Sequence, residues 1–166
     1  MISAHLAFVY LSPLLSVSLN TGDLSLSLIE DAIWKVETNR CESDCPKGDQ
    51  GHARGPLQIH MICWESVCKE KESYAQCEEL SYSLEIFRRT IKRFCNDKRL
   101  EMILGRKPNA EDRLEAYAKC WNGGANWWKA KPNSKKYKNL NNYWTKVQSA
   151  LRQKVKEENE RHKKQT

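Results

Sequence analysis

Beyond its first twenty or so positions, this chain of 166 residues lacks any apolar run long enough to span a bilayer. It also lacks internal repeats, signs of a second domain and the alternating apolar pattern typical of strands. Aromatic and basic residues are not interleaved as they are in known nucleic-acid-binding modules. We therefore expect one mainly helical domain, large enough to form a proper core, with no nucleic-acid partner and no stable membrane insertion.

The N-terminal segment is the one long apolar stretch. Leu6 to Leu19 is apolar and rich in serine, is interrupted by Pro13 and is followed by polar residues. This pattern is typical of the hydrophobic core of a secretory signal and is too short for a comfortable membrane span. Only His5, and no Lys or Arg, precedes it, so an internal hydrophobic segment or a misplaced sequence start is the alternative. We expect residues 1–20 to be a signal peptide and the protein to be secreted.

The cysteines point to the same compartment. Seven follow the apolar segment: Cys41, Cys45, Cys63, Cys68, Cys77, Cys95 and Cys120. This density is typical of a secreted, disulfide-braced domain, and the odd number leaves at least one thiol free or paired with another chain. Cys68 with Cys77 and Cys95 with Cys120 are plausible local pairs. Because the repeated C-x2-C spacing of zinc sites is missing, we favour disulfides over zinc and expect no metal.

The charge balance is basic, with a formal net charge of +7 and Lys and Arg dense after Arg88. A basic secreted protein favours anionic partners such as bacterial walls, although the charge can also serve solubility alone. The basic face of the helix expected over residues 80–94 is either solvated or steers the protein toward anionic walls.

Apolar residues at helical spacing predict most of the secondary structure. A capping box at Ser27 and Glu30 would begin a helix that ends near residues 37–39. Further helical patterns cover residues 57–67, 80–94, 109–122, with Asn109 as N-cap, and 140–155. We expect a loop or a short irregular hairpin over residues 41–54 and loops over residues 69–79, 98–107 and 125–139. We also expect a domain over residues 24–155 and a charged tail over residues 156–166 that is frayed or disordered.

Two carboxylates, Glu37 and Asp49, suggest a chemistry. Glu37 ends an apolar helical run, whereas Asp49 lies in a turn bounded by Gly48 and Gly51. Cleavage of a glycosidic bond needs an acid kept protonated by desolvation and a second carboxylate that stays ionised. From spacing alone, two ordinary surface carboxylates are the simpler interpretation.

The order of short motifs along the chain resembles the invertebrate-type (destabilase-like) lysozymes and related lysozyme-like domains. The motifs are Val36-Glu37-Thr38, Gly48-Asp49-Gln50-Gly51, Gly55-Pro56-Leu57-Gln58-Ile59, Trp64, Asn122-Gly123-Gly124 and Tyr143-Trp144-Thr145-Lys146-Val147. Each motif is weak alone, but together they run in order from about residue 28 to residue 151.

The resemblance implies a mainly α, lysozyme-like, two-lobed fold with a substrate cleft and little strand. It implies a muramidase that cuts the β-1,4 bonds of bacterial peptidoglycan without metal or cofactor, in antibacterial defence or digestion. Glu37 matches the general acid, Asp49 matches the nucleophile or stabiliser, and Gln58 and Ile59 match cleft-lining residues. We expect a monomer whose partner is the cell-wall glycan.

Three departures from the family pattern leave alternatives open. The segment after Asp49 is one residue shorter than in the common invertebrate form, and goose-type and transglycosylase relatives keep the glutamate without a fixed aspartate. A lytic transglycosylase or an inverting mechanism is therefore an alternative, as is a non-catalytic basic protein that binds bacterial walls. The serine and histidine linked to isopeptidase activity in some members are missing at the matching positions, which argues against that activity.

Four further side chains are candidates for binding the glycan. His60 follows the Gly-Pro-Leu-Gln-Ile motif and could bind substrate or tune the carboxylates, although a solvated or structurally bonded histidine is the simpler interpretation. Asn122 could bond an N-acetyl group or cap a helix. Trp127 and Trp128 lie in an expected loop and could stack on a sugar face.

Overall fold

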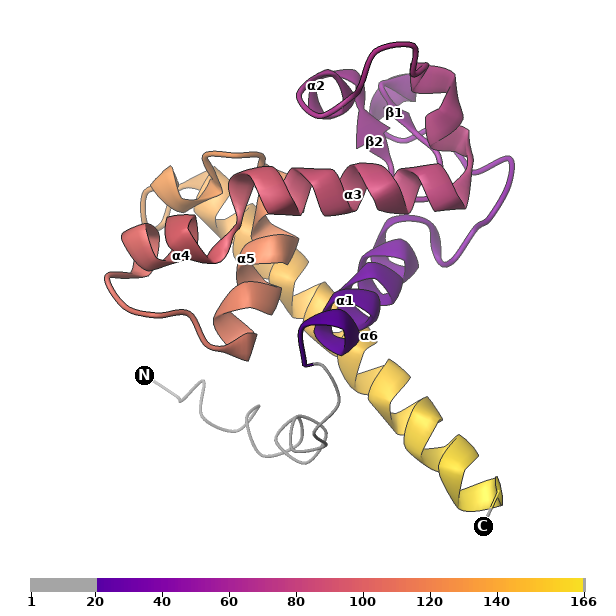
Figure 1. Ribbon diagram of the computed structural model, residues 1–166, viewed down its shortest axis with the longest axis vertical. Coiled ribbons are helices and arrows are strands. Elements are labelled where there is room, and N and C mark those ends of the chain that lie inside the picture. Colours follow the sequence, from indigo (N-terminus) through magenta and orange to yellow (C-terminus); the bar gives the residue numbers. More distant parts are fainter. Residues whose placement is uncertain (1–20, 166) are drawn as a thin grey trace.

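The computed structural model describes residues 21–165, and within them the chain is mainly helical, as predicted (Figure 1). The helices are α1 (Thr21–Thr38), α2 (Met61–Glu65), α3 (Leu80–Phe94), α4 (Asp97–Leu104), α5 (Ala110–Gly123) and α6 (Lys135–Gln165). Short 3-10 helices are η2 (Asp49–Gly51), η3 (Tyr74–Glu78) and η4 (Trp127–Lys129), and two strands are β1 (Ala53–Arg54) and β2 (Ile59–His60). The expected signal peptide over residues 1–20 lies outside the described residues.

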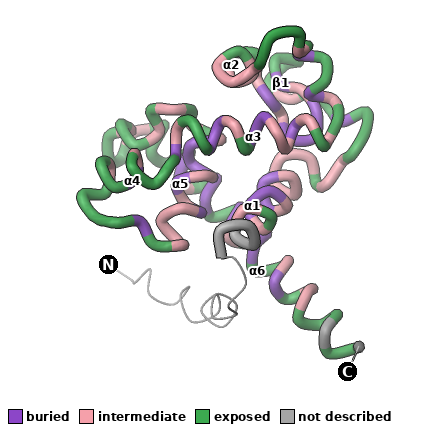
Figure 2. Tube along the Cα trace, in the orientation of Figure 1, coloured by how far each residue is buried: buried purple, intermediate pink, exposed green. Residues whose placement is uncertain are grey.

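The core forms where α1 and α5 pack against each other and against the first half of α6, and where α3 packs against α5. Ile33 of α1, Phe87 of α3 and Val147 of α6 are fully buried there. Figure 2 shows buried positions concentrated where these helices meet and exposed positions along α4 and the far end of α6. Each such side chain contributes about 1.5–3 kcal/mol through removal of apolar surface from water, so this packing fixes how α1 lies against α6.

The β1–β2 hairpin lies beside the C-terminal end of α1. Its strands pair antiparallel, with Ala53 opposite His60 and Arg54 opposite Ile59. The Thr38 hydroxyl donates a hydrogen bond of 2.8 Å to the carbonyl of Pro56 in the hairpin turn. The end of α1 and the hairpin are therefore held together by direct bonding as well as by packing.

Two helices match the sequence predictions closely. The periodic apolar pattern predicted a helix over residues 80–94, and α3 has these bounds. Asn109 caps α5 as predicted, since its side chain accepts a hydrogen bond of 2.8 Å from the Asp112 amide while Asp112 bonds back to the Asn109 amide. Gly124, at φ +75°, follows the last residue of this helix, as expected for glycine just past a helix end.

Two predictions about the first half of the chain are wrong. The chain is already helical at Thr21, so Ser27 lies inside α1 and is not its N-cap. The helical pattern over residues 57–67 yields a turn, strand β2 and only a short helix, α2. The reason is Gln58, whose φ of +51° cannot belong to a right-handed helix.

Three predictions about the second half are also wrong. The expected basic connection over residues 98–107 is largely helix α4, capped by Asn96 and ended by Gly105. The expected loop over residues 125–139 contains η4 and the first turn of α6. The charged tail after residue 156 continues α6 to Gln165, where ion pairs spaced four residues apart, such as Lys156–Glu160 at 3.9 Å, support it.

All seven cysteines carry free thiols in the structure. Neither of the two local pairs that the sequence suggested, Cys68–Cys77 and Cys95–Cys120, is joined by a disulfide. The buried thiol of Cys95 donates instead to the carbonyl of Ala116 at 3.7 Å, and the thiol of Cys41 donates to the carbonyl of Ser43 at 3.2 Å. Among the described residues, no helix combines the length and apolar character needed to cross a membrane.

The hairpin turn generates a test of the fold. A Cβ at Gly55 would lie 1.7 Å from the carbonyl oxygen of Cys77, and the φ of Gly55 is +71°. We expect Gly55→Ala to destabilise the fold by roughly 3 kcal/mol or more, because steric overlap adds to backbone strain. Gly105→Ala is the matched control, since its φ of +68° is similar and its Cβ would meet nothing within 4 Å.

The control should lower the free energy of unfolding by about 1 kcal/mol, the strain of a left-handed residue alone. Urea denaturation of both variants measures the difference. Equal losses would mean that the hairpin turn and the Cys77 backbone are not in close contact.

Candidate functional site

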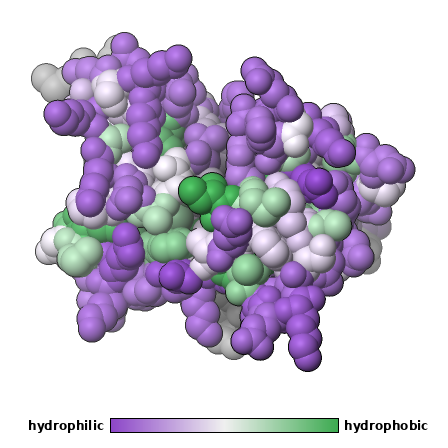
Figure 3. All heavy atoms as spheres, turned by 90° about the horizontal axis from the view of Figure 1, so that it is seen from above, coloured by the Kyte–Doolittle hydropathy of each residue, from purple (hydrophilic) through white to green (hydrophobic). Residues whose placement is uncertain are grey.

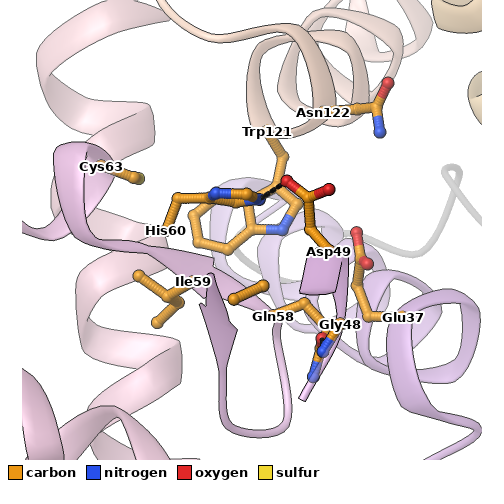
Figure 4. Close-up of a pocket in the computed structure, with 10 residues that line it drawn as sticks. Glu37, Gly48, Asp49, Gln58, Ile59, His60, Cys63, Trp121 and Asn122 are labelled. Atoms are coloured by element: carbon orange, nitrogen blue, oxygen red, sulfur yellow. Dashed lines mark hydrogen bonds and ion pairs between the residues drawn. The ribbon is translucent and has the colours of Figure 1, made fainter. Parts of the chain in front are cut away.

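A cavity of about 300 Å³ opens between the hairpin and the end of α5 (Figure 4). It is lined by Glu37, Gly48, Asp49, Ala53, Gln58, Ile59, His60, Cys63, Trp121 and Asn122. Six of the eight predicted site residues are therefore brought together, although they come from segments up to 85 residues apart. Seen from above, hydrophilic side chains cover most of the surface and hydrophobic ones gather near the middle (Figure 3).

Glu37 lies in the last turn of α1, with its carboxyl group facing the cavity (Figure 4). Burial of the carboxyl raises its pKa from 4.5 to about 7, because desolvation penalises the charged form. A hydrogen bond from Tyr143 and the positive charge of Lys146 oppose this shift and are outweighed by burial. Near neutral pH, Glu37 is thus present in both its acid and its carboxylate form.

Tyr143 is the hydrogen-bond partner of this carboxyl group. Its hydroxyl donates a hydrogen bond of 2.6 Å to Oε1 of Glu37, across 106 residues of sequence. The tyrosine is buried in the α1–α6 packing, and its own pKa lies well above 10 because burial and the neighbouring carboxylate disfavour a phenolate. It therefore remains a hydrogen-bond donor at any physiological pH, and it leaves Oε2 free of this contact.

Asp49 has a different environment from that of Glu37. Its side chain is 69% exposed, at the start of η2, and the imidazole of His60 lies beside it, with 3.6 Å between Oδ2 and Nε2. Its φ of +46° belongs to the left-handed region, which aspartate tolerates better than most residues. The cavity thus contains one desolvated carboxyl group and one that is open to water, as the sequence interpretation expected.

Gln58 holds the turn that carries Asp49. Its side-chain amide donates hydrogen bonds of 2.9 Å to the carbonyls of Pro46 and Gly55, and its oxygen accepts one of 2.7 Å from the amide of Gly48. A Cβ at Gly48 would lie 2.2 Å from this oxygen, so the contact needs glycine. Because both amide donors are used, we infer that Gln58 positions the turn, while its predicted contact with substrate stays a prediction.

The remaining predicted residues divide between the cavity and the core. Ile59, His60 and Asn122 all line the cavity. Trp127 does not: it packs against the hydrophobic core, and its indole nitrogen is buried without a hydrogen-bond partner among the described residues. Trp128 is exposed, but the ammonium of Lys129 lies 5.1 Å from the centre of its ring.

Sequence interpretation missed two residues that shape the site. Trp121 forms a wall of the cavity, bonds the carbonyl of Leu57 at 3.3 Å and packs edge-on against Phe87. Tyr143 controls Glu37, yet it had been noted only within the Tyr-Trp-x-x-Val motif. Both lie at helical spacing that fits a place in the core, and no local signal reveals a polar contact made across such a distance. Among the described residues, no group of His, Cys, Asp or Glu side chains is arranged to hold a metal ion.

The raised pKa of Glu37 makes stability depend on pH. The folded state binds this proton more tightly than the unfolded chain, so the stabilising effect is complete below pH 4.5 and is lost as pH rises through about 7. The free energy of unfolding of the wild type should fall by an amount on the order of 2–3 kcal/mol between pH 4.5 and pH 8, and we expect Glu37→Gln to abolish this fall. Urea titrations at these two pH values measure it; parallel losses in both proteins would place the carboxyl in water.

No family model matches this chain, no curated protein does and no solved structure does.

Proposed function

We propose that this protein is a secreted, lysozyme-like glycoside hydrolase that cleaves β-1,4 bonds of bacterial peptidoglycan, with Glu37 as its general acid. One observation carries the proposal: a glutamate with a pKa of about 7 faces a cavity and is fixed there by a buried tyrosine. A general acid works best when its pKa lies near the working pH. Structural ion pairs lower the pKa of a carboxyl group, so such a role would not explain this shift.

The proposed reaction begins with the neutral form of Glu37. Tyr143 engages Oε1, so the proton is carried on Oε2 and is donated to the glycosidic oxygen as the bond to the sugar carbon breaks. The positive charge that develops on the sugar needs a carboxylate nearby. Glu37, now ionised, then accepts a proton from the water that completes hydrolysis.

Asp49 is the proposed second carboxylate. It lies in the same cavity but in water, where the ionised form that a nucleophile or stabiliser needs is well solvated. His60, 3.6 Å away, can support the carboxylate with a hydrogen bond as the substrate excludes water. Asn122 on the opposite rim offers an amide to the acetamido groups of the glycan.

The exposure of Asp49 also favours a second candidate. A lytic transglycosylase uses the glutamate alone, and an aspartate that is 69% exposed is weakly fixed for nucleophilic attack. In that reaction the sugar's own hydroxyl replaces water and gives an anhydro product. A non-catalytic, wall-binding protein is the third alternative, which the basic charge supports but the pKa of Glu37 does not.

The finer fold assignment belongs to this proposal too. The hairpin with α2 and η3 would form one lobe of a lysozyme-like fold, the helices around α6 the other, and the cavity the cleft between them. Export would oxidise adjacent thiols such as those of Cys95 and Cys120, leaving an odd cysteine. The protein is proposed to act as a monomer.

Replacement of the two carboxyl groups tests the proposal. We expect Glu37→Gln to lower the rate of wall digestion by a factor of about 10³ or more, since the only other carboxyl group that lines the cavity in the described part of the chain, that of Asp49, is open to water. Asp49→Asn should lower it about 10²-fold if this residue stabilises the charged sugar. The measurement is clearing of cell-wall suspensions, with mass spectrometry of the released fragments.

Glu101→Gln is the control, because Glu101 is exposed on α4 and far from the cavity. Full activity of Asp49→Asn together with anhydro-sugar products would establish the transglycosylase instead. Bacterial killing that persists unchanged in Glu37→Gln would leave only the charge-based mechanism.

Tyr143→Phe probes how the acid is tuned. The tyrosine hydroxyl lowers the pKa of Glu37, so its removal should move the alkaline limb of the pH–rate profile upward by about one unit. Lys146 also lowers the pKa of Glu37, but by less than Tyr143 does, so Lys146→Gln should shift the alkaline limb of the profile less. Tyr137→Phe, on the exposed first turn of α6, is the control. A lower rate without a shift would reduce Tyr143 to a packing role.

A further inference from the structure

The positive charge of this protein comes from one part of the chain. Residues 116–156 contain ten Lys and Arg residues and no Asp or Glu, whereas the rest of the chain has 18 basic and 21 acidic residues. The net charge of +7 is therefore the sum of a strongly basic segment and a slightly acidic remainder. A charge distributed for solubility alone would not be confined in this way.

The centre of this segment is a lysine loop, residues 128–138, which joins η4 to the first turn of α6. Its five lysines are Lys129, Lys131, Lys135, Lys136 and Lys138, and all are exposed. None of them lies within ion-pair distance of a carboxylate in the described part of the chain. By contrast, Arg88, Arg89 and Arg113 are each held by acidic partners at 2.7 Å.

The position of these lysines opposes helix stability. Ser134 caps α6 by accepting a hydrogen bond of 3.1 Å from the Tyr137 amide, so Lys135, Lys136 and Lys138 occupy the first turn. That turn carries the positive end of the helix dipole and has no acidic residue. Repulsion among the lysines adds to the unfavourable field. Such a local conflict is expected where function, not folding, selects the residues.

The lysine loop is anchored beside the cavity. The chain leaves α5 just after Asn122, which lines the cavity, and returns at Leu140. A Cβ at Gly123 would lie 2.5 Å from a methyl group of Leu140, so the two ends of the loop are in close contact. A ligand bound by the loop would therefore lie next to the rim on which Asn122 sits.

We propose that the lysine loop binds a linear, phosphate-bearing polyanion that accompanies the wall glycan, such as a chain of phosphodiester units. The link to the glycan rests on the function proposed above, whereas polyanion binding itself does not. Five unpaired ammonium groups along a loop and a helix turn match a flexible chain of regularly spaced phosphates. A membrane surface fits less well, because the loop offers only two partly exposed aromatic rings, Trp128 with the ammonium of Lys129 at 5.1 Å and Tyr137, while the more exposed aliphatic side chains Met61, Ile62 and Met102 belong to α2 and α4.

Charge reversal in the full chain tests this proposal. Binding of soluble poly(glycerol phosphate) to the triple variant K135E/K136E/K138E is measured by titration calorimetry over a range of salt concentrations. The control, K47E/K92E/K98E, makes the same change in net charge at exposed lysines on other surfaces. We expect the loop variant to bind at least tenfold more weakly and to lose about 2 from the slope of log affinity against log salt, while the control changes affinity less than about threefold.

The outcomes separate the possible causes. Acidic residues in the first turn of α6 suit the helix dipole, so the loop variant should melt no lower than the wild type, and weak binding cannot be attributed to unfolding. Equal weakening in both variants would overturn the proposal in favour of net charge alone. Preferential binding to phosphatidylglycerol vesicles would overturn it in favour of lipid headgroups. Because this assay contains no glycan, an inactive muramidase could still pass it, and an active one could fail it.

Discussion

The packing of α1 against α6 is the constraint on which the site depends, since it brings Tyr143 to the carboxyl group of Glu37. Taking a carboxylate out of water is unfavourable, so the Glu37 carboxyl group stays protonated up to about pH 7. The hydrogen bond from Tyr143 stabilises the charged form enough that the proton can be released. Without this packing, Glu37 would be an ordinary glutamate at a helix end.

The second half of the site follows from a different set of bonds. Thr38 ties the end of α1 to Pro56 of the hairpin turn, and Gln58 ties that same turn to Gly48. Asp49 is therefore positioned through backbone groups, while its own side chain stays in water. Glu37, in the last turn of α1, and Asp49, in the loop beyond it, thus acquire opposite environments, because one is set by helix packing and the other by a glycine-bounded turn.

The sequence predicted those features that local pattern determines. The amphipathic period located α3, and Asn109 marked the start of α5, because caps and stripes act within a few residues. The contrasting neighbours of Glu37 and Asp49 suggested their two environments, and the resemblance to lysozymes supplied their expected roles. Tyr143 was not, since a contact across 106 residues leaves no local trace. The left-handed backbone of Gln58 interrupts a segment whose apolar pattern is helical. The charged end of α6 is helical with the support of ion pairs, which a pattern of apolar residues cannot predict.

The acidic cavity and the basic lysine loop would act on the substrate over different distances. The loop's field reaches about 8 Å at physiological salt, so it would act on a wall polymer before the glycan enters the cavity. Glu37 acts only at hydrogen-bond distance, through a proton whose affinity burial sets. Salt would therefore govern the encounter and pH the bond cleavage. Because the loop begins where Asn122 ends the cavity wall, a polymer held by the lysines would keep the adjoining glycan near the acid without adding charge to the cavity itself.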